Sequence, residues 1–392
     1  MNKSINGKFS NLIATFDSDS GIRGKQFEVF VKWFLVNDPD WATQVDQVWL
    51  WNEYPERWGA DCGIDLVFRH KNGEIWSVQA KCYAPNYDIT KHDVDKFLSE
   101  SNRKGIDKCL LIATTDRIGA NARQVCDAQE KKVVRFLRAN FESANVDYPA
   151  TFSALHTAKP KARPQPFAHQ AEAIAAVGTQ LLKADRGQLI MACGTGKTFT
   201  TLWIKESLAA KTTLVLLPSL GLLSQTLHEW TLAANTPFEV LCVCSDATVG
   251  KRVDDETLHC VADLAFPVTS DTGEIKAFLQ RSGTKVVFST YQSSPLLAEV
   301  QTDITISPFD LVIADEAHRC AGKASSDFST VLDATRIRAT KRLFTTATPR
   351  TYSSVLKKVA GERGVEVVGM DDVAVFGEVL YSLSFGEAIK RG

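Results

Sequence analysis

A glycine-rich octapeptide carries the clearest chemical signal in the sequence. The stretch Met191–Thr198 reads MACGTGKT, follows an apolar segment and precedes a helical pattern. Glycines permit a tight turn whose backbone N–H groups face phosphate, and the N-terminus of the next helix favours anions. In such a P-loop the lysine reaches the terminal phosphates of ATP and the final threonine ligates Mg²⁺. The residues predicted to bind ATP–Mg²⁺ here are Gly194, Thr195, Gly196, Lys197 and Thr198.

Two carboxylates follow a later apolar strand, Leu311 to Ala314, in the tetrapeptide Asp-Glu-Ala-His. Ligands bind at the C-terminal edge of such strands. We expect Asp315 to hold Mg²⁺ and Glu316 to orient the water that attacks the terminal phosphate. Thr346-Ala347-Thr348 follows another strand and fits a motif that couples the nucleotide site to movement, with a plain strand end as the alternative.

Two segments near residue 70 have the alternation and turn chemistry of a β-hairpin. We expect strands over 64–69 and 74–81, joined by a three-residue loop that ends on a left-handed Gly73. The register that sets Asp65 opposite Gln79 is favoured because it builds one continuous apolar face. That face consists of the pairs Ile64 with Ala80, Leu66 with Val78 and Phe68 with Trp76.

This register projects Asp65, Gln79 and Lys81 together on the opposite face of the hairpin. Phosphodiester hydrolysis needs a hard divalent cation on oxygen ligands and a positive charge near the reacting phosphate. We expect Asp65 and the Gln79 carbonyl to hold Mg²⁺ with Lys81 alongside, and Glu28, on a helix that begins near Arg23, to add a carboxylate. A polar solvent face on an ordinary hairpin is the alternative.

Other candidate groups have ordinary structural explanations. Asp61 suits a loop cap as well as a metal ligand, so both interpretations stay open. Core packing is favoured over DNA stacking for Trp33, Trp41, Trp49, Trp51 and Trp58, which lie beside apolar neighbours. A solvated helical face is favoured over phosphate binding for Arg117, Arg123, Lys131, Lys132, Arg135 and Arg138.

The elements that position these groups lie on either side of a proline-rich stretch. Residues 147–166 contain four prolines and lack periodicity, so we predict a domain over 1–148, a linker over 149–166 and a second domain over 167–392. In the second domain short apolar strands alternate with helices, which is typical of a parallel sheet covered on both faces. Its expected strands are 188–192, 213–217, 240–244, 285–289, 311–314 and 342–345.

Composition sets outer limits on the protein class. The 392 residues suit two or three domains, and 44% hydrophobic with 23% charged residues is typical of globular proteins. A net charge of −1 gives no basic signal for nucleic acid, so any DNA contact must be local. The nine cysteines show no C-x-x-C pair, and Cys242 and Cys244 suit a strand core. No apolar run approaches the ~20 residues of a membrane helix, so we expect a cytoplasmic protein without membrane contact.

The first half resembles the Mrr-like branch of the PD-(D/E)xK restriction-endonuclease-like superfamily. The segments GIRGKQFEVF, GADCGIDLVF and VQAKCY carry this resemblance. The branch often has Gln where other members have Glu, so Gln79 is compatible with it. The resemblance implies an α/β/α nuclease fold in which Glu28, Asp65, Gln79 and Lys81 form a Mg²⁺-dependent catalytic group.

The second half, from Pro166 to Gly392, resembles the first RecA-like lobe of a superfamily 2 helicase. The resemblance is carried by Gln170 in HQAEAI, the P-loop, PSLGLLSQ, STYQS, DEAH and TAT. It implies that Gln170 recognises adenine. Both halves together, with DRGQLIMACGTGKT and DLAFPVTSD, resemble the N-terminal part of Type ISP (single-polypeptide Type I) restriction-modification enzymes.

This combined resemblance implies ATP-dependent restriction of double-stranded DNA by a site-specific endonuclease coupled to a translocase. The second RecA-like lobe, methyltransferase and target-recognition domains of that family are absent from this sequence, so we expect the chain alone to hydrolyse ATP negligibly. Two alternatives stay open. One is a defence or repair nuclease-helicase without a methyltransferase, and the other is a DNA-remodelling ATPase whose nuclease fold is a non-catalytic clamp.

Overall fold

The computed structural model describes residues 7–60, 63–157, 161–244, 266–323, 327–353 and 367–391. Asp61 and the beginning of the DLAFPVTSD stretch lie outside these ranges. The chain divides into two compact units, one that includes Met1–Ala162 and one that includes Arg163–Val261 and Pro267–Gly392.

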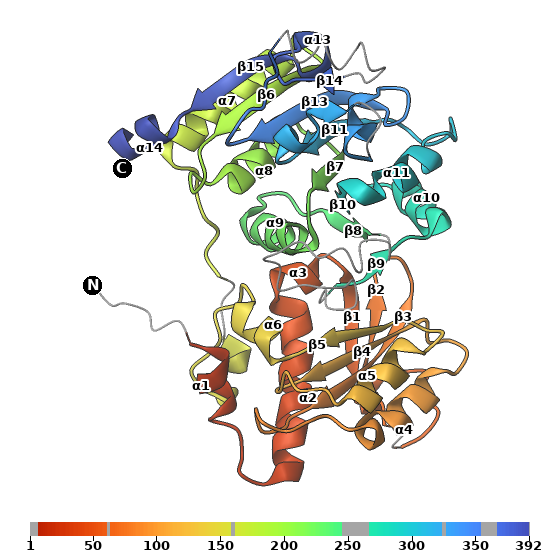
Figure 1. The fold of residues 1–392 in the computed structure, drawn as a ribbon. Helices are drawn as coiled ribbons and strands as arrows, with labels where there is room; N and C mark the ends of the chain where they lie inside the picture. Colours follow the sequence, from red (N-terminus) through yellow and green to blue (C-terminus); the bar gives the residue numbers. More distant parts are fainter. Residues whose placement is uncertain are drawn as a thin grey trace. The chain divides into compact units, whose positions relative to one another are not determined.

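The first unit is an α/β/α sandwich around a sheet of order β1-β2-β3-β4-β5 (Figure 1). The first three strands are antiparallel, and the last two extend the sheet in parallel. The strands are β1 (Val45–Leu50), β2 (Leu66–His70), β3 (Ile75–Lys81), β4 (Lys108–Ala113) and β5 (Val133–Phe136). One apolar cluster unites the sheet with α1 (Phe9–Ile13), α2 (Ser20–Asn37) and α6 (Arg138–Ser143). The other unites it with α4 (Lys91–Ser101) and α5 (Ala120–Asp127), which is the layered fold expected for the nuclease half.

The β2–β3 hairpin has the predicted register. Leu66 pairs with Val78 and Phe68 with Trp76, and Gly73 ends the three-residue loop at φ 95°. The prediction for Ile64 is wrong, because its side chain belongs to the α4–α5 cluster instead of the cluster that holds Leu66. Strand pairing begins only at Leu66, so the chain before it is not held to the strict alternation of a strand.

Two further expectations for the first unit need correction. The stretch around Arg135 is not a solvated helical face: Arg135 lies buried in β5 and forms a 2.8 Å ion pair with Asp127. Lys131 donates to the carbonyls of Ser101 and Arg103. Part of the predicted linker is a 3-10 helix over Phe152–Thr157, whose Leu155 is buried in the core of this unit.

The second unit is a RecA-like α/β fold. Besides a short antiparallel pair, β12 (Gly322–Lys323) with β14 (Val367–Val368), eight described strands form a parallel sheet of order β15-β6-β13-β11-β7-β10-β8-β9. They are β6 (Arg186–Met191), β7 (Thr212–Leu217), β8 (Glu239–Val243), β9 (Val268–Thr269), β10 (Lys285–Thr290), β11 (Phe309–Ala314), β13 (Ala339–Thr346) and β15 (Glu378–Leu383). The six predicted strands are confirmed, whereas the sequence analysis missed the two edge strands, β9 and β15.

Helices cover both faces of this sheet, as expected (Figure 1). The cluster on one face includes side chains of α10 (Thr272–Gln280) and α11 (Ser294–Val300). The helices α7 (Ala168–Leu181), α8 (Lys197–Ser207) and α9 (Leu220–Ala233) pack side by side, with α7 against β6 and β15 and α9 against β7 and β10. Because β6, β13 and β11 are neighbours and run in the same direction, the segments that follow them emerge at one edge of the sheet.

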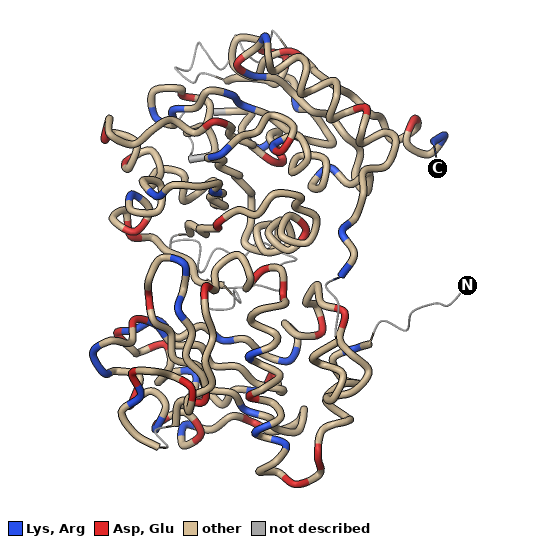
Figure 2. Tube along the Cα trace, turned by 180° about the vertical axis from the view of Figure 1, so that it is seen from behind, with Lys and Arg blue, Asp and Glu red and all other residues tan. Residues whose placement is uncertain are grey.

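Charge and tryptophan placement agree with the sequence-based expectations. Lysine and arginine positions are interspersed with acidic ones in both units, as Figure 2 shows. Trp41 and Trp51 are buried, which confirms core packing for these two rings. Among the described helices, none has the length and apolar character that crossing a bilayer requires.

Two glycines in open space allow a test of the hairpin geometry. A Cβ atom would meet no neighbour within 4 Å at Gly73 or at Gly24, so only the backbone conformation distinguishes them. We expect Gly73→Ala, at φ 95°, to lower the free energy of unfolding of the first unit by about 1 to 2 kcal/mol. Gly24→Ala, inside α2, should raise it by roughly 0.5 to 1 kcal/mol.

Urea unfolding followed by tryptophan fluorescence measures both changes, because six of the eight tryptophans precede residue 148. Equal effects of the two substitutions would show that Gly73 does not adopt the left-handed conformation in solution.

Candidate functional site

The P-loop occupies the turn between β6 and α8. Gly194 and Gly196 have φ of 81° and 74°, a conformation that costs a residue with a side chain. At Gly196 a Cβ atom would also lie 2.3 Å from the side-chain nitrogen of Gln170. The Thr195 hydroxyl donates to the carbonyl of Ala192 at 2.7 Å and closes the turn. The left-handed conformation therefore favours glycine at both positions, and at Gly196 a Cβ atom would also require the Gln170 side chain to move.

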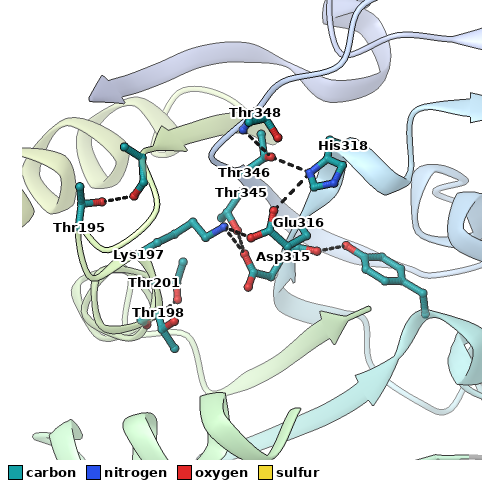
Figure 3. A network of polar contacts seen from close by, with 12 residues as sticks. Thr195, Lys197, Thr198, Thr201, Asp315, Glu316, His318, Thr345, Thr346 and Thr348 are labelled. Carbon is teal, nitrogen blue, oxygen red and sulfur yellow. Dashed lines mark hydrogen bonds and ion pairs between the residues drawn. The ribbon is translucent and has the colours of Figure 1, made fainter. Parts of the chain in front are cut away.

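Lys197 joins this loop to the DEAH carboxylates, as Figure 3 shows. Its ammonium lies 2.6 Å from a Glu316 oxygen and 3.1 Å from an Asp315 oxygen. Burial acts against the charge of Lys197, but the two carboxylates outweigh burial and raise its pKa above the ordinary value. A charged lysine is thus held where the loop and the acidic tetrapeptide meet.

Asp315 is held by groups from two other strands. The Thr345 hydroxyl, on β13, donates to an Asp315 carboxylate oxygen at 2.6 Å. The Tyr291 hydroxyl, just after β10, donates to the Asp315 main-chain carbonyl at 2.6 Å. Glu316 follows at φ 49°, a strained conformation for a residue with a side chain. The neighbouring hydrogen bonds hold the backbone in place as it enters this strained residue.

His318 connects the DEAH tetrapeptide with the predicted coupling motif. Its Nδ1 lies 3.0 Å from the Thr346 hydroxyl and 3.3 Å from a Glu316 oxygen (Figure 3). Burial lowers the pKa of His318, with smaller opposing and reinforcing contributions from nearby charges. The backbone N–H of Thr348 donates to the same threonine hydroxyl at 3.1 Å. His318 therefore connects the Thr346 hydroxyl with the Glu316 carboxylate.

Gln170 is buried against the P-loop. Its side-chain nitrogen donates to the Gly196 carbonyl at 3.1 Å, and its oxygen accepts from the backbone N–H of Phe167 at 2.8 Å. Trp230 of α9 donates from its indole nitrogen to the Thr198 carbonyl at 3.0 Å. The sequence analysis assigned no role to Tyr291, Thr345 or Trp230, and the one available signal was the place of Tyr291 within STYQS.

The first unit contains a pocket of about 230 Å³ beside the hairpin. It brings together two of the predicted site residues, Asp65 from the hairpin and Glu28 from α2. Its lining residues are Lys25, Glu28, Val29, Leu50, Trp51, Asn52, Ala60, Ile64 and Asp65. Lys25, Trp51 and Asn52 are additions to the predicted set, and Lys25 had a usable signal because it stands three residues before Glu28 on one helix.

Asp65 is the most perturbed carboxyl group in this pocket. Burial raises its pKa to about 6, against a hydrogen bond from the backbone N–H of Ala80 at 2.8 Å. The charge of Glu28 raises the pKa further, while the charges of Lys81 and Lys25 lower it. Lys81 does not line the pocket, but its charge acts on Asp65. Perturbed carboxyl groups in a concave site are typical of functional sites.

Gln79 lies on β3 of the hairpin, where it is buried and does not line the pocket. Its side-chain nitrogen donates to the Gly63 carbonyl at 3.2 Å, whereas its side-chain oxygen is buried and has no hydrogen-bond partner among the described residues. A buried acceptor without a donor is costly and is rare in folded proteins. An amide oxygen together with the carboxylates of Asp65 and Glu28 is the kind of donor set that suits a hard cation such as Mg²⁺.

The raised pKa of Asp65 leads to a stability prediction for the metal-free protein. The unfolded chain ionises Asp65 at its ordinary pKa near 4 and the folded chain at about 6, so ionisation favours the unfolded state between these values. We expect Asp65→Asn to match the wild type near pH 4 and to exceed its free energy of unfolding at pH 7 by on the order of 2 to 3 kcal/mol.

The measurement is urea unfolding in a chelator across this pH range. Asp46→Asn, at an exposed ion pair with Arg69, serves as the control. A constant difference between wild type and Asp65→Asn would contradict the burial of this carboxylate.

Comparison with known proteins agrees with this two-part organisation. Residues 36–158 match the Mrr_cat_2 restriction endonuclease family, and residues 163–351 match the ResIII family, the res subunit of Type III restriction enzymes. The "Probable helicase A859L" of African swine fever virus (isolate Pig/Kenya/KEN-50/1950) is 31% identical over 54% of this chain and 21% of its own length. The same helicase of isolate Tick/Malawi/Lil 20-1/1983 is also 31% identical over these shares.

A solved structure of the ATP-dependent Type ISP restriction-modification enzyme LlaBIII bound to DNA is similar over 93% of this chain, with 30% identity and a TM-score of 0.78. A nuclease-deletion mutant of the Type ISP enzyme LlaGI with a DNA substrate mimic matches 58% of this chain at 33% identity and a TM-score of 0.45. This chain spans 24% of the LlaBIII chain. Residues 36–158 are thus similar to a restriction endonuclease domain and residues 163–351 to a ResIII-type helicase domain, and over nearly its whole length the chain resembles about a quarter of LlaBIII.

Proposed function

We propose that this chain is the nuclease and first motor lobe of an ATP-dependent DNA restriction enzyme, in which Mg²⁺-dependent endonucleolytic cleavage is coupled to ATP-driven translocation along double-stranded DNA. One observation carries the proposal. A single chain holds an acidic pocket in its endonuclease domain and an assembled P-loop and DEAH group in its helicase domain. The similar LlaBIII structure is a complex with DNA, which supports DNA as the ligand.

In the nuclease domain, Asp65, Glu28 and the amide oxygen of Gln79 are the groups proposed to hold Mg²⁺. A bound Mg²⁺ supplies a Lewis acid for the phosphate and lowers the pKa of a water. Asp65 is ionised at neutral pH, because its pKa of about 6 lies below 7. The positive charge of Lys81 lowers the pKa of Asp65. Such a charge suits a role beside the reacting phosphate.

In the helicase domain, the backbone amides around Gly194 and Gly196 are proposed to bind the phosphates of ATP, with Lys197 on the terminal ones. Thr198 and Asp315 are proposed to ligate its Mg²⁺, and Glu316 to orient the attacking water. Phosphate has to compete with two carboxylates for Lys197, which lies within 3.1 Å of both. Gln170, which is hydrogen-bonded to the P-loop, is proposed to recognise adenine and so to connect adenine binding with this loop.

The proposed enzyme needs further machinery, since this chain spans 24% of the similar LlaBIII chain. A second RecA-like lobe would close the ATP site and supply an arginine finger, and methyltransferase and target-recognition domains would set where cleavage occurs. These partners are proposals that follow from the resemblance to Type ISP enzymes.

The nuclease proposal predicts loss of DNA cleavage from single substitutions. Asp65→Ala and Lys81→Ala should each lower Mg²⁺-dependent nicking of plasmid DNA by at least about 100-fold, because a metal ligand or the charge at the phosphate is lost. Asp46→Ala, on the exposed edge of the same sheet, should leave the rate unchanged. Wild-type nicking by either site variant would refute the assignment. No nicking by the parental chain in Mg²⁺ or Mn²⁺ would favour a non-catalytic clamp.

The motor proposal predicts opposite effects at the two ends of the Lys197 ion pair. Lys197→Ala should weaken binding of a fluorescent ATP analogue by roughly tenfold or more, because a cation at the phosphates is lost. Glu316→Gln should retain or improve binding, because it releases Lys197 from a 2.6 Å ion pair. In a chain extended through a second lobe, Glu316→Gln should abolish phosphate release. Hydrolysis by that variant at the parental rate would contradict the role given to Glu316.

A further inference from the structure

Lys25 forms an ion pair with Glu28 inside the nuclease pocket. Its ammonium lies 2.9 Å and 3.0 Å from the two carboxylate oxygens of Glu28, one helical turn away on α2. The side chain of Lys25 is 78% exposed, whereas that of Glu28 is only 14% exposed. The carboxylate is thus set into the pocket, and the lysine reaches it from the solvent side.

The same lysine also belongs to the surroundings of Asp65. Both residues line the pocket, and the charge of Lys25 acts on Asp65 in the direction opposite to that of Glu28. The formal charges of Asp65 and Glu28 are balanced by those of Lys25 and Lys81. A divalent cation therefore approaches a site whose negative charge is already neutralised, and it has to compete with an ammonium for Glu28.

We propose that Lys25 is a displaceable counter-ion of the nuclease site, which competes with the divalent metal for Glu28 and, once displaced, contacts a DNA phosphate. This inference rests on the metal-dependent nuclease function proposed above. It assigns a role to a residue that neither binds the metal nor belongs to the predicted catalytic group. Because metal binding releases Lys25 for a DNA phosphate, the proposed role also makes metal binding and DNA binding mutually dependent.

The unequal exposure of the two partners explains why Lys25 is the group that moves. Glu28 is held in place by α2, because Phe27 and Phe30 of the same helix are fully buried. Lys25 has a flexible four-carbon stem and is mostly in water, and exposed ion pairs of this kind are weak. A hard divalent cation binds carboxylate oxygens more strongly than an ammonium does, so it displaces Lys25 without a change in the backbone.

The first test measures metal affinity directly, without activity. Mn²⁺ binding to the 392-residue chain is followed by water-proton relaxation at low salt, with no nucleotide present. Lys25→Met should lower the Kd for Mn²⁺ by about 3-fold to 10-fold, because the competing charge is removed and the apolar stem is kept. Lys25→Arg keeps the competing positive charge, so its Mn²⁺ binding should stay as weak as that of the wild type. The matched control is Lys32→Met, which removes an equal charge from the same helix, where Lys32 pairs with Glu53 at 2.5 Å.

The second test measures DNA affinity with Ca²⁺ in place of Mg²⁺ and without any divalent cation. With Ca²⁺, Lys25→Met should weaken binding to a short duplex and reduce the salt dependence by about one phosphate contact. Without a divalent cation, Lys25 stays with Glu28, and the variant should bind like the wild type. Tighter metal binding combined with weaker DNA binding is a pair of changes that general destabilisation of α2 cannot produce.

The outcomes separate this inference from the proposal beneath it. Asp65→Asn defines the nuclease-site component of Mn²⁺ binding. If wild-type binding does not depend on Asp65, the metal site itself is refuted, and the role of Lys25 falls with it. If binding depends on Asp65 but Lys25→Met leaves the Kd unchanged or raises it, the metal site stands and the counter-ion role is overturned. A loss of DNA affinity in Lys25→Met without any divalent cation would also overturn it.

Discussion

Parallel strands that end at one edge of a sheet are the constraint on which the chemistry of the second unit depends. Strands β6, β13 and β11 are neighbours, although long stretches of sequence separate them. Because they run in one direction, the P-loop, Thr345 and the DEAH carboxylates emerge side by side. The 2.6 Å contact between Lys197 and Glu316, which are 119 residues apart, is a direct consequence. No local sequence feature could hold these groups together without the sheet.

A lysine beside two carboxylates is the motif that both units share. Lys197 bridges Asp315 and Glu316, and Lys25 pairs with Glu28 close to Asp65. Partly buried like charges are costly unless a cation lies between them, so each lysine lowers the cost of keeping the carboxylates in place. The two lysines differ in exposure, 13% against 78%. Lys197, with little exposed surface, suits a fixed place among the phosphates. Lys25, which is mostly in water, suits a role in which a metal ion displaces it.

Strained backbone in the second unit occurs in the segments proposed to meet the nucleotide and also at Ala209, just after the end of α8, where φ is 50°. Glu316 has a left-handed backbone, as do the P-loop glycines, and at Gly196 a Cβ atom would also require the Gln170 side chain to move. Strained residues persist only where the surroundings hold them, and here hydrogen bonds from Thr345 and Tyr291 do so next to Glu316. Strands β7, β10, β11 and β13 pair in continuous register, so the centre of the sheet is a regular support for these few residues.

Much of this organisation could be predicted from local sequence. The P-loop, the DEAH strand and the hairpin register depend on residues that are close in the chain, and periodicity with turn chemistry identifies such elements. The hairpin prediction held from Leu66 onward, where backbone pairing enforces alternation, and it failed at Ile64, where pairing has not begun. Arg135 was misplaced because a short buried strand that contains arginine lacks the apolar pattern of a strand.

The sequence by itself determined the two domain types and the chemical groups available to each, because motif identity is local. Only the tertiary structure decided how those groups meet. It set Lys25 and Glu28 beside Asp65, left the Gln79 oxygen buried without a donor among the described residues, and placed Thr345 and Tyr291 on Asp315. These contacts depend on strand order and helix packing, which arise from long-range burial of apolar surface and leave no signature in the spacing of the residues concerned.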